Sequence, residues 1–264
     1  NHYHGSGWQD DEGNWHPTIN ILSCRRTYKR LYNVLKGQKP ECVFFRHGMP
    51  VAPIAGYVDV VAQGEDWVVE GTRQYERMTP DIFRTKEMRI QYGTPYTWYS
   101  HHHYWRGRKH GGRIPLTNIL CYCLPHHTLP LIGREGIWPV WDAVDPFWVG
   151  DTEFIPYWDE DSPVHIHQRD VLGTVYLRRD EGRALLVVAN YYDDWKDVSV
   201  ILETEQMGLG PNPKVTRAVP HPIRQPEDPE GADPMKNTPL RLRGSNLPLR
   251  ISGKNVEIIL LEAE

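Results

Sequence analysis

The sequence predicts an α/β region over residues 1–160 and an all-β region over residues 161–264. In the first region, amphipathic helical segments alternate with short apolar runs, an order typical of parallel α/β structure. From Val171 onward, short runs rich in β-branched and aliphatic residues are separated by turn signals such as Asp180-Glu181-Gly182. We therefore expect an α/β domain followed by an antiparallel β-sandwich.

The first predicted helix begins near Pro17 and Thr18 and ends before Gly37 and Pro40, since both residues break helices. It is expected to bury one apolar stripe and to expose its basic residues to water. The stripe consists of Ile19, Leu22, Leu31 and Leu35, and the basic residues are Arg25, Arg26, Lys29, Arg30 and Lys36. Nucleic-acid binding is an alternative use of the basic run, but a solvated amphipathic face explains it without a partner.

Two apolar runs are predicted strands that lead into a histidine. His47 comes shortly after Cys42–Phe45, and His101 comes shortly after Tyr96–Tyr99. In a (β/α)8 barrel, functional residues lie at the carboxyl ends of the strands. We therefore expect His47 and His101 at one active face.

The positions of the other predicted elements show how many residues are left for a barrel. Further helical segments are predicted at Pro80–Gln91 and Leu116–Leu131. The expected sandwich strands are Gly173–Arg178, Arg183–Tyr191, Val198–Glu203, Val215–Val219, Leu240–Leu242 and Val256–Leu261. A complete (β/α)8 barrel takes about 250 residues. The sequence therefore predicts a partial (β/α)8 barrel over residues 1–160, followed by the β-sandwich over residues 161–264.

Asp59 and Glu65 follow the first predicted strand and are the candidate catalytic residues. Hydrolysis of a glycosidic bond uses one carboxylic acid to protonate the leaving oxygen and a second carboxylate at the anomeric carbon. Trp67 comes directly behind the two acids, and an indole ring suits the apolar face of a sugar. The alternative interpretation is that both acids are ordinary solvated loop residues.

The candidate substrate-binding side chains could stack on a sugar ring, hydrogen-bond a hydroxyl or fix a substrate oxygen. They are Tyr3, His4, Trp8, His47, Trp67, Arg84, Tyr99 and His101. Each aromatic residue could instead pack in the core, and we expect this of Trp138, Trp141 and Trp148, which lie where the two regions must pack. No cofactor and no metal ligand is predicted for this site.

Charge and composition narrow the class of partner. A formal net charge of -4 gives no electrostatic basis for binding nucleic acid or an anionic membrane, so neither is expected. The chain has 10 Trp and 14 Tyr against 5 Phe, and such polar-tipped rings suit sugar faces, protein interfaces and core edges. The four cysteines, Cys24, Cys42, Cys121 and Cys123, lack paired spacing and are predicted to be buried free thiols. A glycan is the expected partner.

The compartment and the oligomeric state are not assigned by the sequence. No apolar run approaches the length of a membrane span. Because the chain starts without Met, we interpret it as a fragment or a processed product. Secretion or export to the periplasm is favoured if a signal peptide preceded it.

Two other functions stay open at this point. The histidines include candidate zinc ligands of a metal hydrolase, namely His2, His4, His47, His101, His102, His103, His126 and His127. Three adjacent histidines on a strand cannot all serve one metal, because successive side chains point to opposite faces. The other possibility is a non-catalytic module or pseudoenzyme whose aromatic residues bind glycans without cleaving them.

Four passages of the sequence resemble a known family. They are Tyr3–Trp8 with Asp11-Glu12, the helix segment Arg26–Tyr32, the run Asp59–Glu65, and ALLVVAN at Ala184–Asn190. Together they are similar to the carboxyl-terminal half of a TIM-barrel glycosidase with an appended β-sandwich, distantly similar to glycoside hydrolase family 123. The resemblance implies a carbohydrate-active enzyme. That family cleaves with substrate assistance from an Asp-Glu pair on an earlier strand, which the resemblance puts before Asn1.

Overall fold

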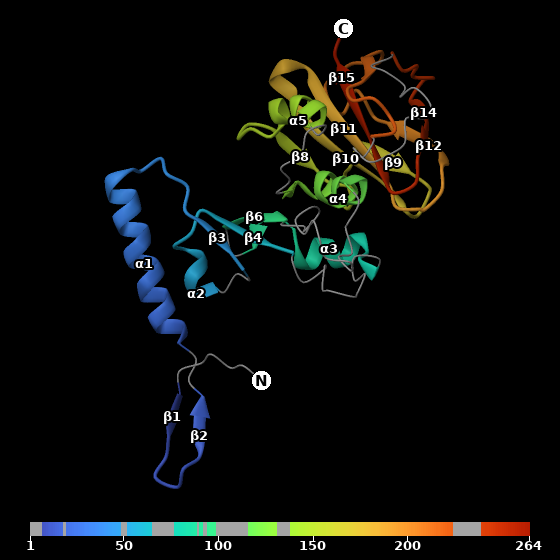
Figure 1. Cartoon of the computed structure of the whole chain (residues 1–264). Coiled ribbons are helices and arrows are strands. Elements are labelled where there is room, and N and C mark those ends of the chain that lie inside the picture. The colour runs from blue at the N-terminus through green and yellow to red at the C-terminus, as the bar shows by residue number, and fades with distance from the viewer. Residues whose placement is uncertain are drawn as a thin grey trace. The chain divides into compact units, whose positions relative to one another are not determined.

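A computed structural model describes most of the chain. The described residues are 7–17, 20–48, 52–64, 77–88, 90–91, 94–98, 116–130, 138–223 and 239–264. By contacts the chain divides into two compact units, residues 1–63 with 89–97 and residues 64–88 with 98–264 (Figure 1). The boundary predicted from the sequence, between residues 160 and 161, divides an α/β region from an all-β region and does not follow these contacts. It stays a prediction.

The first unit contains a small sheet with parallel strands. Its order is β3-β4-β6-β5, and these strands span Phe45–His47, Val60–Gln63, Thr94–Trp98 and Ile90–Gln91. Strands β3 and β4 pair in parallel, as the alternating pattern predicts, whereas β5 and β6 pair antiparallel. The first strand begins at Phe45 instead of Cys42, so His47 lies inside it as its last residue.

Helix α1 is amphipathic as predicted, but the predicted faces are wrong. It spans Ile21–Gln38 and begins later than expected, because residues up to Pro17 form strand β2 of the hairpin β1–β2 (Gly7–Gln9 and Trp15–Pro17). Leu22 is 68% exposed and Val34 is 59% exposed. Leu31 and Leu35, also expected in the core, are exposed as well.

The side of α1 that faces the sheet is polar and aromatic. Arg25 donates to the Tyr57 hydroxyl at 2.8 Å, and its guanidinium lies 5.2 Å from the centre of the Tyr57 ring. Tyr28 stacks near Phe44 and accepts a hydrogen bond from Arg46 at 3.0 Å. The core beneath is small, with Ile54, Val58, Val61 and Tyr96 as its buried members, next to helix α2 (Ala52–Ala55). Hydrogen bonds and cation–π contacts therefore hold α1 where an apolar stripe was expected.

The second unit contains two antiparallel sheets. The five-stranded sheet has the order β13-β15-β11-β10-β8, and the three-stranded sheet has the order β14-β12-β9. The strands are β8 (Glu153–Ile155), β9 (Val164–Ile166), β10 (Val171–Arg178), β11 (Arg183–Asn190), β12 (Lys196–Leu202), β13 (Lys214–Arg217), β14 (Asn246–Ile251) and β15 (Asn255–Glu262).

Five of the six predicted strands are confirmed within a few residues, and one is misplaced. No strand lies at Leu240–Leu242, and β14 follows it at Asn246–Ile251. Pro248 interrupts the β pattern of that run, but β14 is an edge strand, where a residue without an N–H is tolerated. The three-residue strands β8 and β9 are too short to be predicted from alternation.

The five-stranded sheet has an apolar core on each of its two faces. On one face, Val175, Leu186 and Ile259 pack against side chains of the three-stranded sheet such as Val200 and Leu249. On the other face, a second core gathers the helices of this unit, which Figure 1 shows in green and teal beside the sheet. These are α3 (Pro80–Lys86), α4 (Leu116–Cys123), the 3-10 turn η3 (Leu124–His126), α5 (Trp138–Val144) and the 3-10 turn η4 (Asp145–Phe147).

Side chains of the five-stranded sheet hold the end of α4 and the turn after it. The Tyr176 hydroxyl donates to the Leu124 carbonyl at 2.5 Å, and the Thr174 hydroxyl donates to the Pro125 carbonyl at 3.0 Å. The last carbonyls of a helix have no partner inside the helix, so donors from the sheet satisfy them. For this reason α4 belongs to the same unit as the antiparallel sheets.

Other expectations about side chains are partly confirmed. All four cysteines are free, but only Cys121 and Cys123 are buried, and Cys24 is exposed on α1. Trp141 and Trp148 pack against the helical core as expected, whereas Trp138 is exposed. Among the described helices, none is long and apolar enough to cross a membrane.

Candidate functional site

The carboxyl ends of β3 and β4 form the edge at which the sequence places its site. Because these strands run parallel, with His47 opposite Ala62, His47 lies near the end where β4 reaches Gln63. Gly64 follows with a φ of 120°, a conformation that L side chains rarely adopt, and it turns the chain out of the strand. Glu65 is the next residue in the chain and lies outside the described residues.

Asp59 lies at the opposite end of β4. It directly precedes the strand, and its backbone N–H donates to the Phe44 carbonyl at 2.9 Å. His47 comes three residues after Phe44 on β3, the parallel neighbour of β4. At the usual rise of a strand, this separates the backbones of Phe44 and His47 by about 10 Å. Asp59 is therefore at the amino end of the strands, where barrel residues generally serve stability.

The Asp59 carboxylate is engaged by its neighbours. Its Oδ2 accepts from the Phe44 backbone N–H at 2.6 Å and lies 2.9 Å from Nζ of Lys36, near the end of α1. Burial by itself raises the pKa of Asp59, but the hydrogen bonds from Phe44 and Lys36, together with the charge of Lys36, lower the pKa below its usual value. Asp59 is thus a charged carboxylate at neutral pH and is poorly suited to donate a proton.

Trp8, a candidate sugar-stacking residue, lies on the β1–β2 hairpin. Its ring stacks on His16 with ring centres 4.4 Å apart, and most of the remaining side chain is exposed. Asp10 accepts from Nε2 of His16 at 2.7 Å and from the backbone N–H of Asn14 at 2.6 Å. The hydrogen bond from His16 lowers the pKa of Asp10. The hairpin therefore presents an indole backed by an imidazole, with a carboxylate beside them.

Arg84, a candidate for fixing a substrate oxygen, belongs to the second unit. Its guanidinium lies 5.3 Å from the centre of the Trp158 ring and 3.8 Å from the carboxylate of Asp81. Trp158 also stacks with His126 at 5.6 Å. The Trp158 ring therefore contacts both Arg84 and His126, which fix its position within the second unit.

His126 is a buried neutral histidine. Its Nδ1 is 2.6 Å from the Tyr122 carbonyl, so Nδ1 carries the proton, and its Nε2 is 3.1 Å from the Tyr157 hydroxyl, which can donate to it. Burial, together with the charge of Arg84, lowers the pKa of His126 to about 4, although the hydrogen bonds with the carbonyls of Tyr122 and Pro80 act in the opposite direction. Both ring nitrogens are thus used within the protein.

The metal-hydrolase alternative gains no support from the described part of the chain. No group of three His, Cys, Asp or Glu side chains there could hold a metal ion. His165, which is separated from His167 by one residue, lies 3.0 Å from the carboxylate of Glu203. His2, His4, His101, His102 and His103 are outside the described residues.

Six of the ten predicted site residues are likewise outside the described ranges. They are Tyr3, His4, Glu65, Trp67, Tyr99 and His101. Of the four that are described, Trp8, His47 and Asp59 belong to the first unit and Arg84 to the second. Their roles in catalysis and substrate binding stay predictions.

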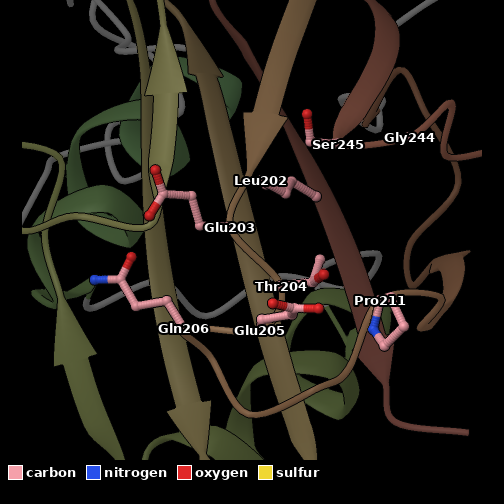
Figure 2. A pocket seen from close by; sticks show the side chains of 8 residues that line it. All are labelled: Leu202, Glu203, Thr204, Glu205, Gln206, Pro211, Gly244 and Ser245. Carbon is pink, nitrogen blue, oxygen red and sulfur yellow. The ribbon is translucent and has the colours of Figure 1, made fainter.

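An open pocket in the second unit was not predicted from the sequence. It has a volume of about 470 Å³ and is lined by residues 202–206, by Pro211, and by Gly244 and Ser245 just before β14. Figure 2 shows Glu203 and Gln206 extending to one side, while Glu205 extends toward Pro211. The polar run Glu203-Thr204-Glu205-Gln206 at the end of a predicted strand is the signal in the sequence, but such runs are common in loops.

Residues 135–225 match the family model described as the glycoside hydrolase 123 C-terminal domain. This is the family that the sequence resembles, and the resemblance is confirmed over that segment. The match covers β8–β13 of the antiparallel sheets and helix α5. A search of curated proteins finds no match.

Several solved glycosidases are similar in fold. A GH27 β-L-arabinopyranosidase from Geobacillus stearothermophilus is 9% identical with a TM-score of 0.51, covering 98% of this chain and 66% of its own. The α-galactosidase I of Mortierella vinacea is 9% identical with a TM-score of 0.50, covering 93% and 65%. An Anoxybacillus α-amylase is 10% identical with a TM-score of 0.50, covering 91% and 56%.

These likenesses concern the fold, because the identities are low. The neighbours are TIM-barrel glycoside hydrolases, and the mixed helix-and-strand region followed by antiparallel sheets agrees with the predicted fold class at that level. The chain spans less than two thirds of the length of each of the three proteins.

Proposed function

We propose that this chain is part of a glycoside hydrolase that cleaves a glycosidic bond in a glycan. The observation that carries the proposal is the match of residues 135–225 to the C-terminal domain of glycoside hydrolase family 123. The fold likeness to glycosidases over nearly the whole chain supports it. The predicted pair of carboxylates, Asp59 and Glu65, is compatible with this class of reaction.

We also propose that the chain consists of part of a (β/α)8 barrel and a β-sandwich. Residues 161–264 form a β-sandwich, supported by the single core that the two antiparallel sheets share. Residues 1–160 form part of a (β/α)8 barrel, supported by the parallel pair β3–β4 and by the side of α1 that exposes Leu31, Val34 and Leu35. In a complete barrel, that side of the helix and the β3 edge would be covered by neighbouring units.

Within the site, we assign the proton donor to Glu65. This residue follows β4 at its carboxyl end, the same end as His47, and barrel enzymes hold their reactive groups there. His47, Trp8, Trp67, Tyr3, His4, Tyr99, His101 and Arg84 are proposed to bind the sugar. Asp59 is proposed as the charged second carboxylate, although its contacts with Lys36 and Phe44 equally suit a structural role.

The first experiment is turnover of a panel of aryl glycosides by the purified chain and by Glu65→Gln. We expect hydrolysis of at least one aryl glycoside and a loss of kcat of at least about 100-fold in the variant, since general acid catalysis contributes about that much. Asp180→Asn is the matched control, because Asp180 is an exposed acidic residue in the turn Arg179–Glu181 and is not a candidate site residue.

Two results would contradict the proposal. If wild-type protein hydrolyses none of the glycosides, this chain does not cleave them by itself. If Glu65→Gln retains full turnover while the protein is active, the acid is another residue.

A further inference from the structure

The outer face of the three-stranded sheet carries a polar strip along β12 and β14. Asp197 pairs with Arg250 across the two strands, and Ser199 pairs with Pro248. Val198 and Val200 alternate with them and are buried, so the side chains of Asp197 and Ser199 point outward. The side chains of Asp197 and Arg250 are 88% and 69% exposed. This face is therefore open to solvent around the pair Asp197–Arg250.

Trp195 stands at one end of the strip. It precedes β12 by one residue, is 45% exposed, and has the same strand parity as Asp197. The guanidinium of Arg250 lies 5.5 Å from the centre of the Trp195 ring, and His221 meets the same ring edge-on at 5.8 Å. The buried imidazole of His221 contacts the indole from the protein side, while the exposed Arg250 also lies 3.9 Å from the Asp197 carboxylate.

The open pocket of Figure 2 lies at the other end of the same strand. Leu202 ends β12, and the pocket is lined by the residues that follow it and by Ser245 before β14. Between Trp195 and the pocket, Ser199 donates to Asn246 at 2.7 Å, and the seven residues of β12 span about 20 Å. An aromatic ring, the polar groups of Asp197, Ser199 and Asn246, and a pocket thus follow one strand, with the half-buried Ile201 as the last outward residue of β12.

The charges of the strip decide the class of ligand. Asp197 lies opposite Arg250, and Glu203 pairs with His165, so neither sign dominates. A polyanion would meet these carboxylates, and an apolar ligand would leave the hydrogen-bonding groups unpaired. A chain of neutral sugars offers both hydroxyl groups and the apolar ring faces that stack on indole.

We propose that this sheet face binds a neutral polysaccharide chain along β12, with one sugar ring stacked on Trp195 and a second contact in the pocket at residues 203–206. The ring of Trp195 takes the sugar on the side that Arg250 covers, and the guanidinium moves aside to hydrogen-bond hydroxyl groups. Binding here needs no hydrolysis. The proposed face contains neither of the predicted catalytic residues, Asp59 and Glu65.

The experiment is affinity electrophoresis of the full chain in native gels that contain galactomannan, xyloglucan or mixed-linkage glucan, with alginate as the anionic comparison. We expect at least one neutral polymer to retard the wild type, and Trp195→Ala to weaken retardation at least tenfold. Trp138→Ala is the matched control, since Trp138 is an exposed tryptophan elsewhere in the same unit. Its retardation should equal that of the wild type.

Further measurements separate binding from folding and from hydrolysis. Arg250→Ala changes an exposed side chain and should weaken retardation as well, while thermal unfolding of both variants stays close to wild type. Turnover of a small aryl glycoside should be the same in Trp195→Ala and wild type. Absence of retardation by every neutral polymer, retardation by alginate alone, or full retardation of Trp195→Ala would overturn the proposal.

Discussion

The two units stabilise their helices by different means. In the second unit, α4 is apolar and almost wholly buried against the five-stranded sheet, where Leu116, Ile119 and Leu120 are 0% exposed. In the first unit, α1 has no buried residue, and polar side chains such as Arg25 and Lys36 connect it to the sheet. The second unit therefore has a complete core, whereas the described part of the first unit relies on a few specific polar contacts.

The largest expected effect is the loss of a core side chain in the second unit. Leu186 on β11 is 0% exposed between the two sheets. Leu186→Ala should lower the free energy of unfolding by about 3 kcal/mol, since it removes buried methyl groups and leaves a cavity. Urea unfolding followed by circular dichroism measures it.

The matched control is Leu31→Ala on the exposed side of α1. Leucine and alanine both favour helix, so the free energy of unfolding should change by less than about 0.5 kcal/mol. Equal losses in the two variants would remove the contrast between the units.

The next effect is a pH dependence that belongs to the second unit. Unfolded protein protonates His126 below a pH of about 6.5, but the folded protein does so only near 4. The unfolded state therefore binds more protons in this window, and stability falls as pH drops from about 6.5 to 4. The shift corresponds to about 3 kcal/mol when the window is fully crossed.

This contribution is measured as the difference between wild type and His126→Asn in urea unfolding from pH 7 to 4. Taking the difference removes other titrating groups, including Glu257, whose pKa burial raises to about 7, and His221, whose pKa burial lowers to about 4. If the free energies of unfolding of the two proteins changed in parallel with pH, His126 would have the same pKa in the folded and unfolded states, which would contradict the prediction.

A smaller effect is expected from breaking the contact between Lys36 and Asp59. Asp59→Asn keeps an oxygen that can accept from the Phe44 N–H but loses the charge that faces Lys36. We expect a loss of about 1 kcal/mol, typical of a partly buried charged hydrogen bond, detected as faster hydrogen exchange in β3 and β4.

The same variant separates the two interpretations of Asp59. If it exchanges like wild type yet loses hydrolysis of aryl glycosides, Asp59 is a catalytic carboxylate. If exchange accelerates and the remaining folded protein turns over normally, Asp59 is a structural anchor. Asp180→Asn serves again as control, because Asp180 is exposed in the turn Arg179–Glu181.

The sequence predicted the sheets of the second unit better than the helix of the first. Strands such as Arg183–Asn190 are continuous apolar runs between strong turn signals, and both features are local. Periodicity correctly showed that α1 has two faces. It could not tell which face meets the sheet, because that depends on partners such as Tyr57 and Phe44, which come later in the chain.

The candidate site was only partly predictable for a similar reason. Strand β4 was not predicted, so Asp59 was placed after the first strand, and nothing local indicated that it precedes a second, parallel strand. Trp195 was also missed, although its polar neighbours Asp193, Asp194 and Lys196 are a signal for an exposed tryptophan at a turn. Which exposed side chains share one face becomes known only from the strand register.

The outward side of α1 also affects how the protein behaves in solution. Contiguous exposed apolar residues favour association, and Leu31, Val34 and Leu35 are exposed neighbours on α1 at a spacing of three and four residues. Association at this surface would bury it, so the midpoint of thermal unfolding would rise with protein concentration. A melting temperature of this chain is therefore meaningful only together with the concentration at which it was measured.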